Sequence, residues 1–510
     1  MNRKLQKECE SGIEYILPDY MGDIKKLLSC KGKAIPTGKF VGDGSVEVSG
    51  CVDYDLLYLD AEGKLTAVNA SSEFTENFVT DTETYIDSLE EGRVTSLKVR
   101  VTGPRKISMK ADVEIRLTVC CENEIKVNGD VFAEKEETVE KRFSEVTYAT
   151  SLFAKSGERE YAEIMEKFEG VASDDAEVIS VNGSTVFSDA VAGDGEVTLK
   201  GENVVTAIFR LPDRAPVMIK KSIPFEEVIG LDGAKAEMCA VATGFVSSAD
   251  VGLGMDGESL SAVANIIAEY SVQLIENTSV SVVSDAYTVD GDCRNEYAHT
   301  RFSELVYAGR KKLSIDVKCD KTEERFSGLC DVISIGAEVR NTNAVLEKDC
   351  IEIMGEIAVS GVGYETNVDG SVSYIPIKIQ ESFSEKVNID CQKTDKTQVE
   401  CRLSTDDFDI SCDGETLNVR CIASALVEIY EARDVRMLVK SERVEGEHQK
   451  RDASVITVYY PKAGESLFEV AKRYKTTALK IANDNALSES AAASFDSSDS
   501  LVGIKKLIIR

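Results

Sequence analysis

The residues with the clearest potential for chemistry are a glycine run in the middle of the chain. Residues 252–257, GLGMDG, fit the pattern G-x-G-x-x-G, which binds a dinucleotide phosphate when a strand precedes it and a helix follows it. However, residues 256–260 (DGESL) match residues 413–417 (DGETL), where the first two glycines are missing and strand-like sequence follows. We therefore predict a hairpin turn at this run rather than a nucleotide site.

Histidine and cysteine chemistry is the next candidate. His299 and His448 are far apart in sequence and lack a nucleophile motif, so we expect surface residues rather than general bases. The adjacent Cys120 and Cys121 would point to opposite faces of a strand, with one in the core. Two histidines and no C-x-x-C pair make a zinc site improbable. We find no catalytic signal and expect a protein that is not an enzyme and uses no cofactor or metal.

The overall charge excludes some classes of partner. The chain has 510 residues and a formal net charge of −31, which argues against a protein built to bind nucleic acid or an anionic membrane surface. No run of about twenty uncharged apolar residues occurs, so no transmembrane helix is expected. The amino terminus lacks the apolar segment of a signal peptide. We expect a cytoplasmic protein with reduced cysteines, most of them small core residues.

Three tandem repeats organise most of the chain. Each repeat has an apolar tetrapeptide (LLSC, VISV or VISI) whose first residue stands 23 positions before a glycine, at Gly50, Gly201 and Gly355. Phe74 and Phe225 lie 24 residues beyond their glycines, whereas Phe383 lies 28 beyond, which indicates a four-residue insertion. KRFSEVTYA at 141–149 recurs as TRFSELVYA at 300–308. We predict that RFSE opens a short helical or irregular connector between repeats.

Each repeat alternates apolar and polar residues over short runs, as strands do. Turn signals separate the runs, with GDG at 42–44 and 193–195 and DG at 256–257, 369–370 and 413–414. The sequence therefore predicts a mainly β fold with three tandem antiparallel, sandwich-like domains. We expect the first domain, with an N-terminal segment, at 1–160, the second at 161–318 and the third at 319–445.

The last sixty residues have a different pattern. A charged linker is expected at 446–453, followed at 455–460 (VITVYY) by a strand. Ser466 and Glu469 form an S-x-x-E capping box. The buried stripe of the first helix is expected to be Leu467, Val470, Ala471 and Tyr474. A second helix is capped by Thr476 or Thr477, and 507–509 supply a closing strand. We therefore expect a small βααβ domain at 454–510.

The tail resembles the LysM domain, in which two helices pack on one side of a two-stranded sheet. The matching elements are AGESL at 463–467, VAKRY at 470–474, TT at 476–477, Asn485 and Gly503. Three departures stand out. Lys475 replaces a glycine that often follows the tyrosine, residues 488–500 lengthen the loop before the last strand, and the entry to that strand is one residue longer.

The repeats, together with ILPDYMGDIKKLL at 16–28, are similar to the SPOCS domains of endospore-forming Firmicutes. Tandem SPOCS domains followed by one LysM domain form the architecture of the SipL-like family of spore-coat morphogenesis proteins. The resemblance implies a non-enzymatic assembly factor in the mother-cell cytoplasm, recruited to the forespore surface. Its implied protein partner is the sporulation ATPase that forms the coat basement layer.

Two kinds of ligand remain open for the tail, besides a role in folding or dimerisation alone. Many LysM domains bind N-acetylglucosamine polymers such as peptidoglycan between two loops, which here map to Gly464, Glu465, Ser466, Leu467, Asn485, Ala486 and Leu487. The missing signal peptide favours a protein ligand. Phe468, about 100° from the helix stripe, is then the predicted contact residue, unless it packs against Tyr459 or Tyr460. The residues that could meet an acidic partner, or could simply be solvated, are Lys472, Arg473 and Lys475.

Overall fold

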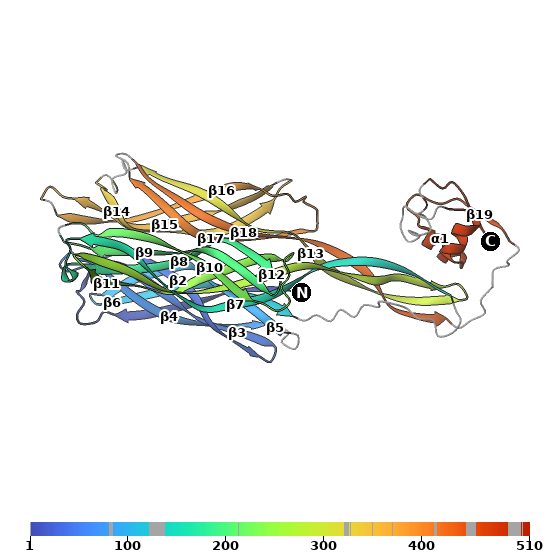
Figure 1. Cartoon of the computed structure of the whole chain (residues 1–510), viewed down its shortest axis with the longest axis horizontal. Helices are drawn as coiled ribbons and strands as arrows, with labels where there is room; N and C mark the ends of the chain where they lie inside the picture. The colour runs from blue at the N-terminus through green and yellow to red at the C-terminus, as the bar shows by residue number, and fades with distance from the viewer. Residues whose placement is uncertain are drawn as a thin grey trace. The chain divides into compact units, whose positions relative to one another are not determined.

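The computed structural model describes residues 2–80, 85–121, 138–212, 214–320, 326, 328–348, 350–369, 371–412, 416–444, 455–487, 501 and 503–510. The chain is mainly β, with several antiparallel sheets, as the sequence predicts (Figure 1). Two compact units can be distinguished. The first unit comprises Met1–Asn123, Thr150–Glu276 and Leu305–Tyr430, and the second comprises Glu124–Ala149, Asn277–Glu304 and Glu431–Arg510.

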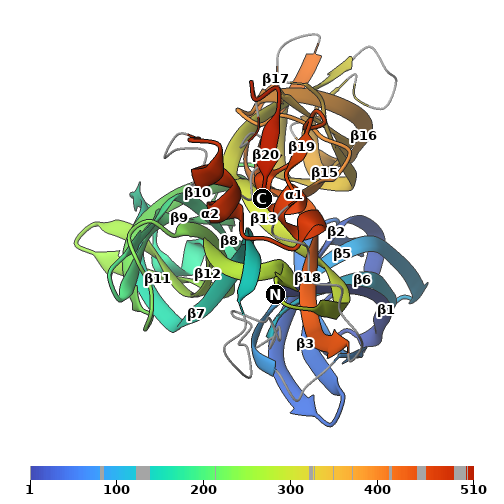
Figure 2. The ribbon, with the colours of Figure 1, turned by 90° about the vertical axis from the view of Figure 1, so that its right-hand side faces the viewer.

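Eighteen of the strands fall into three groups of six with the same sheet organisation (Figure 2). In each group the first, sixth and fifth strands form one sheet, and the second, third and fourth form the other. The first group consists of β1 (Asn2–Ile16), β2 (Ile24–Gly42), β3 (Ser45–Asp60), β4 (Leu65–Val79), β5 (Tyr85–Gly103) and β6 (Lys106–Cys121). The second consists of β7 (Val139–Glu169), β8 (Glu177–Gly193), β9 (Glu196–Arg210), β10 (Val217–Gly230), β11 (Cys239–Asp256) and β12 (Ser259–Thr288), with a 3-10 turn at Ser173–Asp175. The third consists of β13 (Asp292–Asp320), β14 (Asp331–Leu346), β15 (Cys350–Thr366), β16 (Val372–Asn388), β17 (Thr397–Cys412) and β18 (Thr416–Val444).

Asp-Gly turns join neighbouring strands where the sequence predicts them. Gly44 and Gly195 have φ of 77° and 79° in the turns between β2 and β3 and between β8 and β9. Glycine adopts such angles without strain. At the GLGMDG run, Asp256 pairs with Ser259 across the β11–β12 turn, so the prediction of a hairpin is confirmed. The predicted turns at 369–370 and 413–414 include residues outside those that the structure describes.

The glycine and phenylalanine that recur in the repeats face each other across neighbouring strands. The pairs in register are Gly50–Phe74, Gly201–Phe225 and Gly355–Phe383. The packing is close, because a Cβ on Gly201 would lie 2.7 Å from Cζ of Phe225 and 2.2 Å from the carbonyl oxygen of Val186. The spacing that marks each repeat in the sequence is therefore a cross-strand packing unit, in which the glycine makes room for the ring.

A β-bulge also recurs, at the apolar tetrapeptide. The register shifts between Leu27 and Ser29 in β2, between Val178 and Ser180 in β8, and between Val332 and Ser334 in β14. The residues skipped by these shifts are Leu28, Ile179 and Ile333. A bulge interrupts the strict alternation of side chains, and all three residues belong to one apolar cluster with Leu57, Ile208 and Val362. This central cluster is shared by all three groups of strands.

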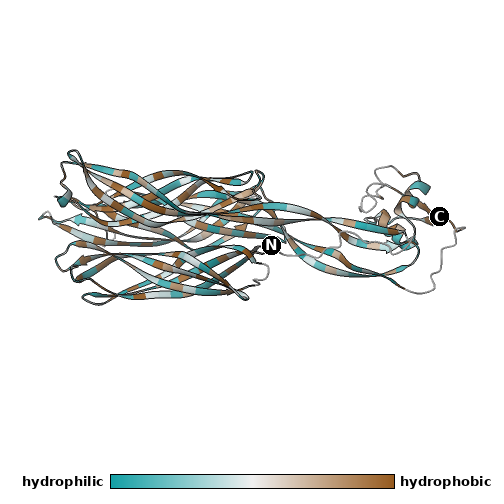
Figure 3. Cartoon of the chain, turned by 60° about the horizontal axis from the view of Figure 1, so that its bottom comes forward, coloured by the Kyte–Doolittle hydropathy of each residue, from teal (hydrophilic) through white to brown (hydrophobic). Residues whose placement is uncertain are grey.

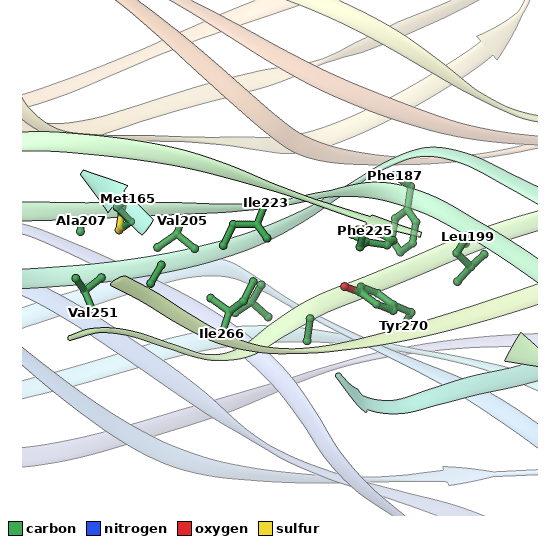
Figure 4. Close-up of a cluster of buried hydrophobic side chains, with 14 of the residues drawn as sticks. Met165, Phe187, Leu199, Val205, Ala207, Ile223, Phe225, Val251, Ile266 and Tyr270 are labelled. Carbon is green, nitrogen blue, oxygen red and sulfur yellow. The ribbon is translucent and has the colours of Figure 1, made fainter. Parts of the chain in front are cut away.

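Each group also has an apolar core of its own, in which hydrophobic and hydrophilic residues alternate along the strands (Figure 3). In the second group Phe187, Leu199, Phe225 and Tyr270 lie in this core (Figure 4). The buried hydroxyl of Tyr270 accepts a hydrogen bond from Asn203 Nδ2 at 2.7 Å, so its polar atom is satisfied. The strand alternation predicted from the sequence is confirmed.

Two half-buried lysines of β2, Lys31 and Lys33, contact the other groups. Lys33 Nζ donates to the carbonyl oxygens of Gly183 (3.2 Å) and Val246 (2.7 Å) in the second group. Lys31 Nζ donates to the carbonyl oxygen of Ile335 in the third group at 3.0 Å. Burial lowers the pKa of both ammonium groups, that of Lys33 to about 8. The contacts between groups therefore include hydrogen bonds from partly buried ammonium groups to backbone carbonyls.

Lys33→Met is expected to remove a pH-dependent part of the stability. The pKa of Lys33 is lower in the folded chain than in the unfolded chain, so the unfolded state binds the extra proton between about pH 8 and 10.4. The contribution of Lys33 to the free energy of unfolding should thus rise through this window, by up to about 1.4 kcal/mol per pH unit, and stay flat below it.

Urea unfolding of wild type and variant at pH 7, 8, 9 and 10 measures this difference. The matched control is Lys26→Met, because Lys26 is exposed on the same strand. A wild-type advantage that does not grow between pH 8 and 10 would contradict the burial of the Lys33 ammonium group.

In the second unit, parts of β7, β12, β13 and β18 pack together. Each of these strands contributes one residue to a buried apolar cluster, formed by Val146, Val282, Phe302 and Met437. β7 and β13 run unbroken over 31 and 29 residues, through both copies of the RFSE segment. The predicted helical or irregular connector at RFSE is therefore wrong. Its alternating side chains continue the strand, and Phe302 is buried in the cluster.

The predicted boundaries at 160/161 and 318/319 fall inside β7 and β13. The three groups of strands instead run over 2–121, 139–288 and 292–444. Long strands that alternate without interruption leave no composition change at these points. The predicted linker at 446–453 lies outside the residues that the structure describes.

Candidate functional site

The C-terminal residues form a βααβ segment within the second unit. Its elements are β19 (Thr457–Tyr459), α1 (Leu467–Tyr474), α2 (Ala478–Asp484) and β20 (Leu507–Ile509), and β19 pairs antiparallel with β20. The predicted capping box opens α1. Ser466 Oγ accepts from the Glu469 N–H, and the Glu469 carboxylate accepts from the Ser466 N–H, both at 3.2 Å. The predicted order of elements and this helix start are confirmed.

Apolar side chains of both helices, including the predicted stripe of α1, form the core of the segment. Leu467, Val470 and Ala471 of α1 are fully buried, and Tyr474 packs against them. In α2 the buried residues are Ala478, Ile481 and Ala482. Thr477 caps α2 by accepting from the Lys480 N–H at 3.1 Å, which decides between the two predicted caps.

Several residues predicted to line a sugar groove point inward. Glu465 is buried, accepts from Tyr459 Oη at 2.7 Å and forms an ion pair with Arg473 at 2.6 Å. Burial raises the pKa of this carboxyl, but the hydrogen bonds from Tyr459 and its neighbours lower it more, so the pKa lies below its ordinary value. Ser466 and Leu467 are also buried, whereas Gly464 and Ala486 are exposed and Leu487 is half-buried.

Asn485 ties α2 to β20. Its Nδ2 donates to the carbonyl oxygens of Ile481 (2.8 Å) and Ile508 (2.7 Å), and its Oδ1 accepts from the Ile508 N–H at 2.6 Å. Both amide hydrogens are therefore engaged with backbone groups. Asn485 therefore holds the closing strand in place, and its predicted role in a groove stays a prediction.

Lys475 ends α1 in the left-handed conformation, with φ 49° and ψ 51°. A residue with a Cβ costs about 1–2 kcal/mol in this region, whereas glycine does not. Lys475→Gly is therefore expected to stabilise the segment by about 1 kcal/mol relative to Lys475→Ala. Both variants lose the lysine side chain, so their difference isolates the backbone. Hydrogen exchange of the α1 amides in the full chain measures it, and equal protection in the two variants would contradict it.

Phe468 lies against a different part of the second unit. Its side chain is fully buried, and its ring meets that of Tyr287, on β12, edge to face with 5.2 Å between centroids. Phe468 therefore meets an element of this chain that the sequence did not predict. Tyr459, which belongs to the same cluster, packs edge to face against Tyr474, at 5.6 Å.

Polar contacts surround this aromatic pair. They are the hydrogen bond from Tyr287 Oη to the Thr476 carbonyl oxygen (2.8 Å) and the ion pairs Lys472–Asp285 (2.5 Å), Lys475–Asp292 (2.5 Å) and Arg142–Glu469 (3.5 Å). Burial raises the pKa of Asp285, but hydrogen bonds from Lys472 and Tyr297 lower it more, and the net pKa is below its ordinary value. We call residues 285–292, at the β12–β13 turn, the tip hairpin. It covers one face of α1.

Sequence reasoning missed the tip hairpin as part of the site. Asp290-Gly291 between two strand patterns is a hairpin signal. Nothing in the sequence, however, connects Tyr287 with a helix about 180 residues further along the chain.

The histidine, cysteine and metal-ligating candidates do not form a site in the part of the chain that the structure describes. His299 is exposed, as expected, whereas His448 lies outside the described residues. Cys120 is buried, and no cysteine whose side chain is described forms a disulfide. Within the described part of the chain, no group of three or more His, Cys, Asp or Glu residues could hold a metal ion. No described helix is both long and apolar enough to cross a membrane.

Comparison with known proteins adds no relative. No protein-family model, no curated protein and no solved structure matches the chain.

Proposed function

We propose that the chain is a non-enzymatic interaction scaffold in endospore coat assembly. In this proposal it is SipL-like, with three SPOCS-like β domains and a C-terminal LysM domain. That domain docks on the coat-basement morphogenetic ATPase at the forespore surface, from the mother-cell cytoplasm. Three groups of strands with one organisation, followed by a βααβ segment, are the order of domains expected from the resemblance.

The observation that carries the choice of a protein ligand is the exterior of α1. This face packs against aromatic and acidic side chains of a protein element, through Phe468, Lys472 and Lys475. The loop residues that a sugar groove would need are instead engaged internally, because Glu465 pairs with Arg473 and Asn485 bonds to backbone. Both facts favour a protein ligand over a glycan.

Charge reversal on α1 tests the proposal. Lys472→Glu in the full chain is expected to weaken binding to the purified coat-basement ATPase about tenfold, since it places like charge against an acidic partner. The matched control is Lys480→Glu, on the exposed side of α2, which should change the affinity little. Biolayer interferometry measures the affinity of both variants for the ATPase.

A parallel titration with an N-acetylglucosamine oligomer covers the glycan alternative. Binding of the oligomer without binding of the ATPase would overturn the proposal. An equal loss of ATPase affinity in the two variants would show that α1 is not the docking surface.

A further inference from the structure

The contact between α1 and the tip hairpin has the organisation of a protein–protein interface. The Phe468–Tyr287 ring pair forms a dry centre, because the two side chains are 0% and 5% exposed. Lys472 and Lys475 on α1 face Asp285 and Asp292 on the tip hairpin at the rim. An apolar aromatic centre with a charged rim is the arrangement of binding hot spots.

Phe468 links this interface to the buried cluster of the βααβ segment. The interior stripe of α1 runs through Leu467, Val470 and Ala471. Phe468 is one residue from Leu467 and therefore about 100° around the helix. Its ring pair is completed by Tyr287, and the described members of this cluster from outside the segment are Tyr287 and Val289. The segment thus offers an aromatic side chain that another element must cover.

The rim contacts are weak enough for the interface to be reversible. The Lys472 and Asp285 side chains are 36% and 19% exposed, and those of Lys475 and Asp292 are 38% and 57% exposed. Ion pairs with this access to water contribute little to stability. The ring pair adds a modest stabilisation to that of its buried area. A partner with similar groups can therefore replace the tip hairpin at small net cost.

We propose that the tip hairpin occupies the surface of α1 on which the protein partner docks, and that the two compete for it. The hairpin also defines the chemistry of that partner, which presents an aromatic side chain flanked by two carboxylates. This inference rests on the proposed function, and it adds both the recognition element and a built-in competitor. Partner binding displaces the tip hairpin from α1, because Phe468, Lys472 and Lys475 cannot contact the partner and the hairpin at the same time.

The occupancy of α1 can be tested without a partner. A carbodiimide joins a lysine and a carboxylate that are already in contact, so the full chain should yield Lys472–Asp285 and Lys475–Asp292 cross-linked peptides in mass spectrometry. Asp292→Lys should abolish the second of these. Absence of both cross-links from the wild-type chain overturns the inference.

The competition is tested by variants on the side of the tip hairpin. Tyr287→Ala and the milder Asp292→Lys should each raise the affinity of the full chain for the purified ATPase at least about fivefold, since they release the docking surface. Asp292 is 57% exposed, so its replacement tests the inference even if Tyr287→Ala disturbs folding. The matched control is Glu145→Lys, exposed on β7 of the same unit, which should leave the affinity unchanged.

Two outcomes separate the inference from the proposed function. Unchanged or weaker ATPase binding by both tip-hairpin variants overturns the competition and leaves the scaffold function standing. No ATPase binding by the wild type or any variant, with the cross-links intact, overturns the proposed partner and the competition together. A loss of the wild-type cross-links when the ATPase is added before the carbodiimide supports both the proposed function and the competition.

Discussion

Replacing Gly201 by alanine is expected to destabilise the first unit by about 2–4 kcal/mol. The added Cβ would lie 2.2 Å from the carbonyl oxygen of Val186 and 2.7 Å from Cζ of Phe225. The carbonyl belongs to β8, which pairs with β9 along its whole length, so it cannot retreat without disturbing the sheet. The ring cannot retreat either, because it stacks on Tyr270 with 4.4 Å between centroids and meets Phe187 edge to face.

The matched control for this prediction is Gly254→Ala. A Cβ on Gly254, in β11 of the same group, would meet nothing within 4 Å, so a change of at most about 0.5 kcal/mol is expected. Urea unfolding followed by circular dichroism measures both variants. Equal stability of the two would contradict the close approach of Phe225 to the backbone at Gly201.

Replacing Phe468 by alanine is expected to cost about 3–5 kcal/mol of local stability in the second unit. The change empties the centre of the contact between α1 and the tip hairpin, where the Phe468 ring is fully buried. Hydrogen exchange should accelerate both in α1 and around Tyr287, on two segments far apart in sequence. Phe468→Glu should be more damaging still, since it buries a carboxylate in an apolar centre.

An exposed leucine in the same segment provides the control. Leu479, on α2, is 62% exposed, and Leu479→Ala should leave exchange in both segments within about 0.5 kcal/mol of wild type. If Phe468→Ala accelerates exchange in α1 but not around Tyr287, then Phe468 is a core residue of the segment alone. That result would remove the tip hairpin from the site.

Local signals in the sequence predicted the local features of the fold. The Asp-Gly turns succeed because a positive φ restricts the choice of residue at one position. The repeated glycine and phenylalanine reveal the repeats because a ring over a backbone tolerates no Cβ. The capping box succeeds for a similar reason, since Ser466 and Glu469 satisfy each other's backbone groups within four residues.

Features that depend on distant parts of the chain could not be predicted in this way. Leu28 and Leu27 are chemically identical, yet Leu28 enters the central cluster and Leu27 packs on the core of its own group. The recurring tetrapeptide marks the place of the bulge, but its composition does not show that a bulge occurs there. The boundary predicted at 160/161 falls within β7, whose alternating pattern continues past it without a break.

In the candidate site, too, the local features could be predicted from the sequence and the long-range contact could not. The start of α1, its stripe and the cap of α2 followed from spacing, whereas the position of Phe468 did not. From its place off the stripe we predicted a contact with an external partner, whereas in the structure the ring meets Tyr287. Tyr287 lies about 180 residues earlier, and the sequence contains no pattern that relates the two.

The central cluster has a consequence for the synthesis of the chain. Strands β1–β6 lie within the first 121 residues, so this group can close its own core early. Leu28 and Leu57, however, are not fully covered until Ile333 and Val362 have been synthesised. At 5–20 residues per second, the ribosome needs about 15–60 s to add those roughly 300 residues. During that time the nascent chain carries an uncovered apolar patch, which makes it a target for chaperones and gives truncated products a reason to aggregate.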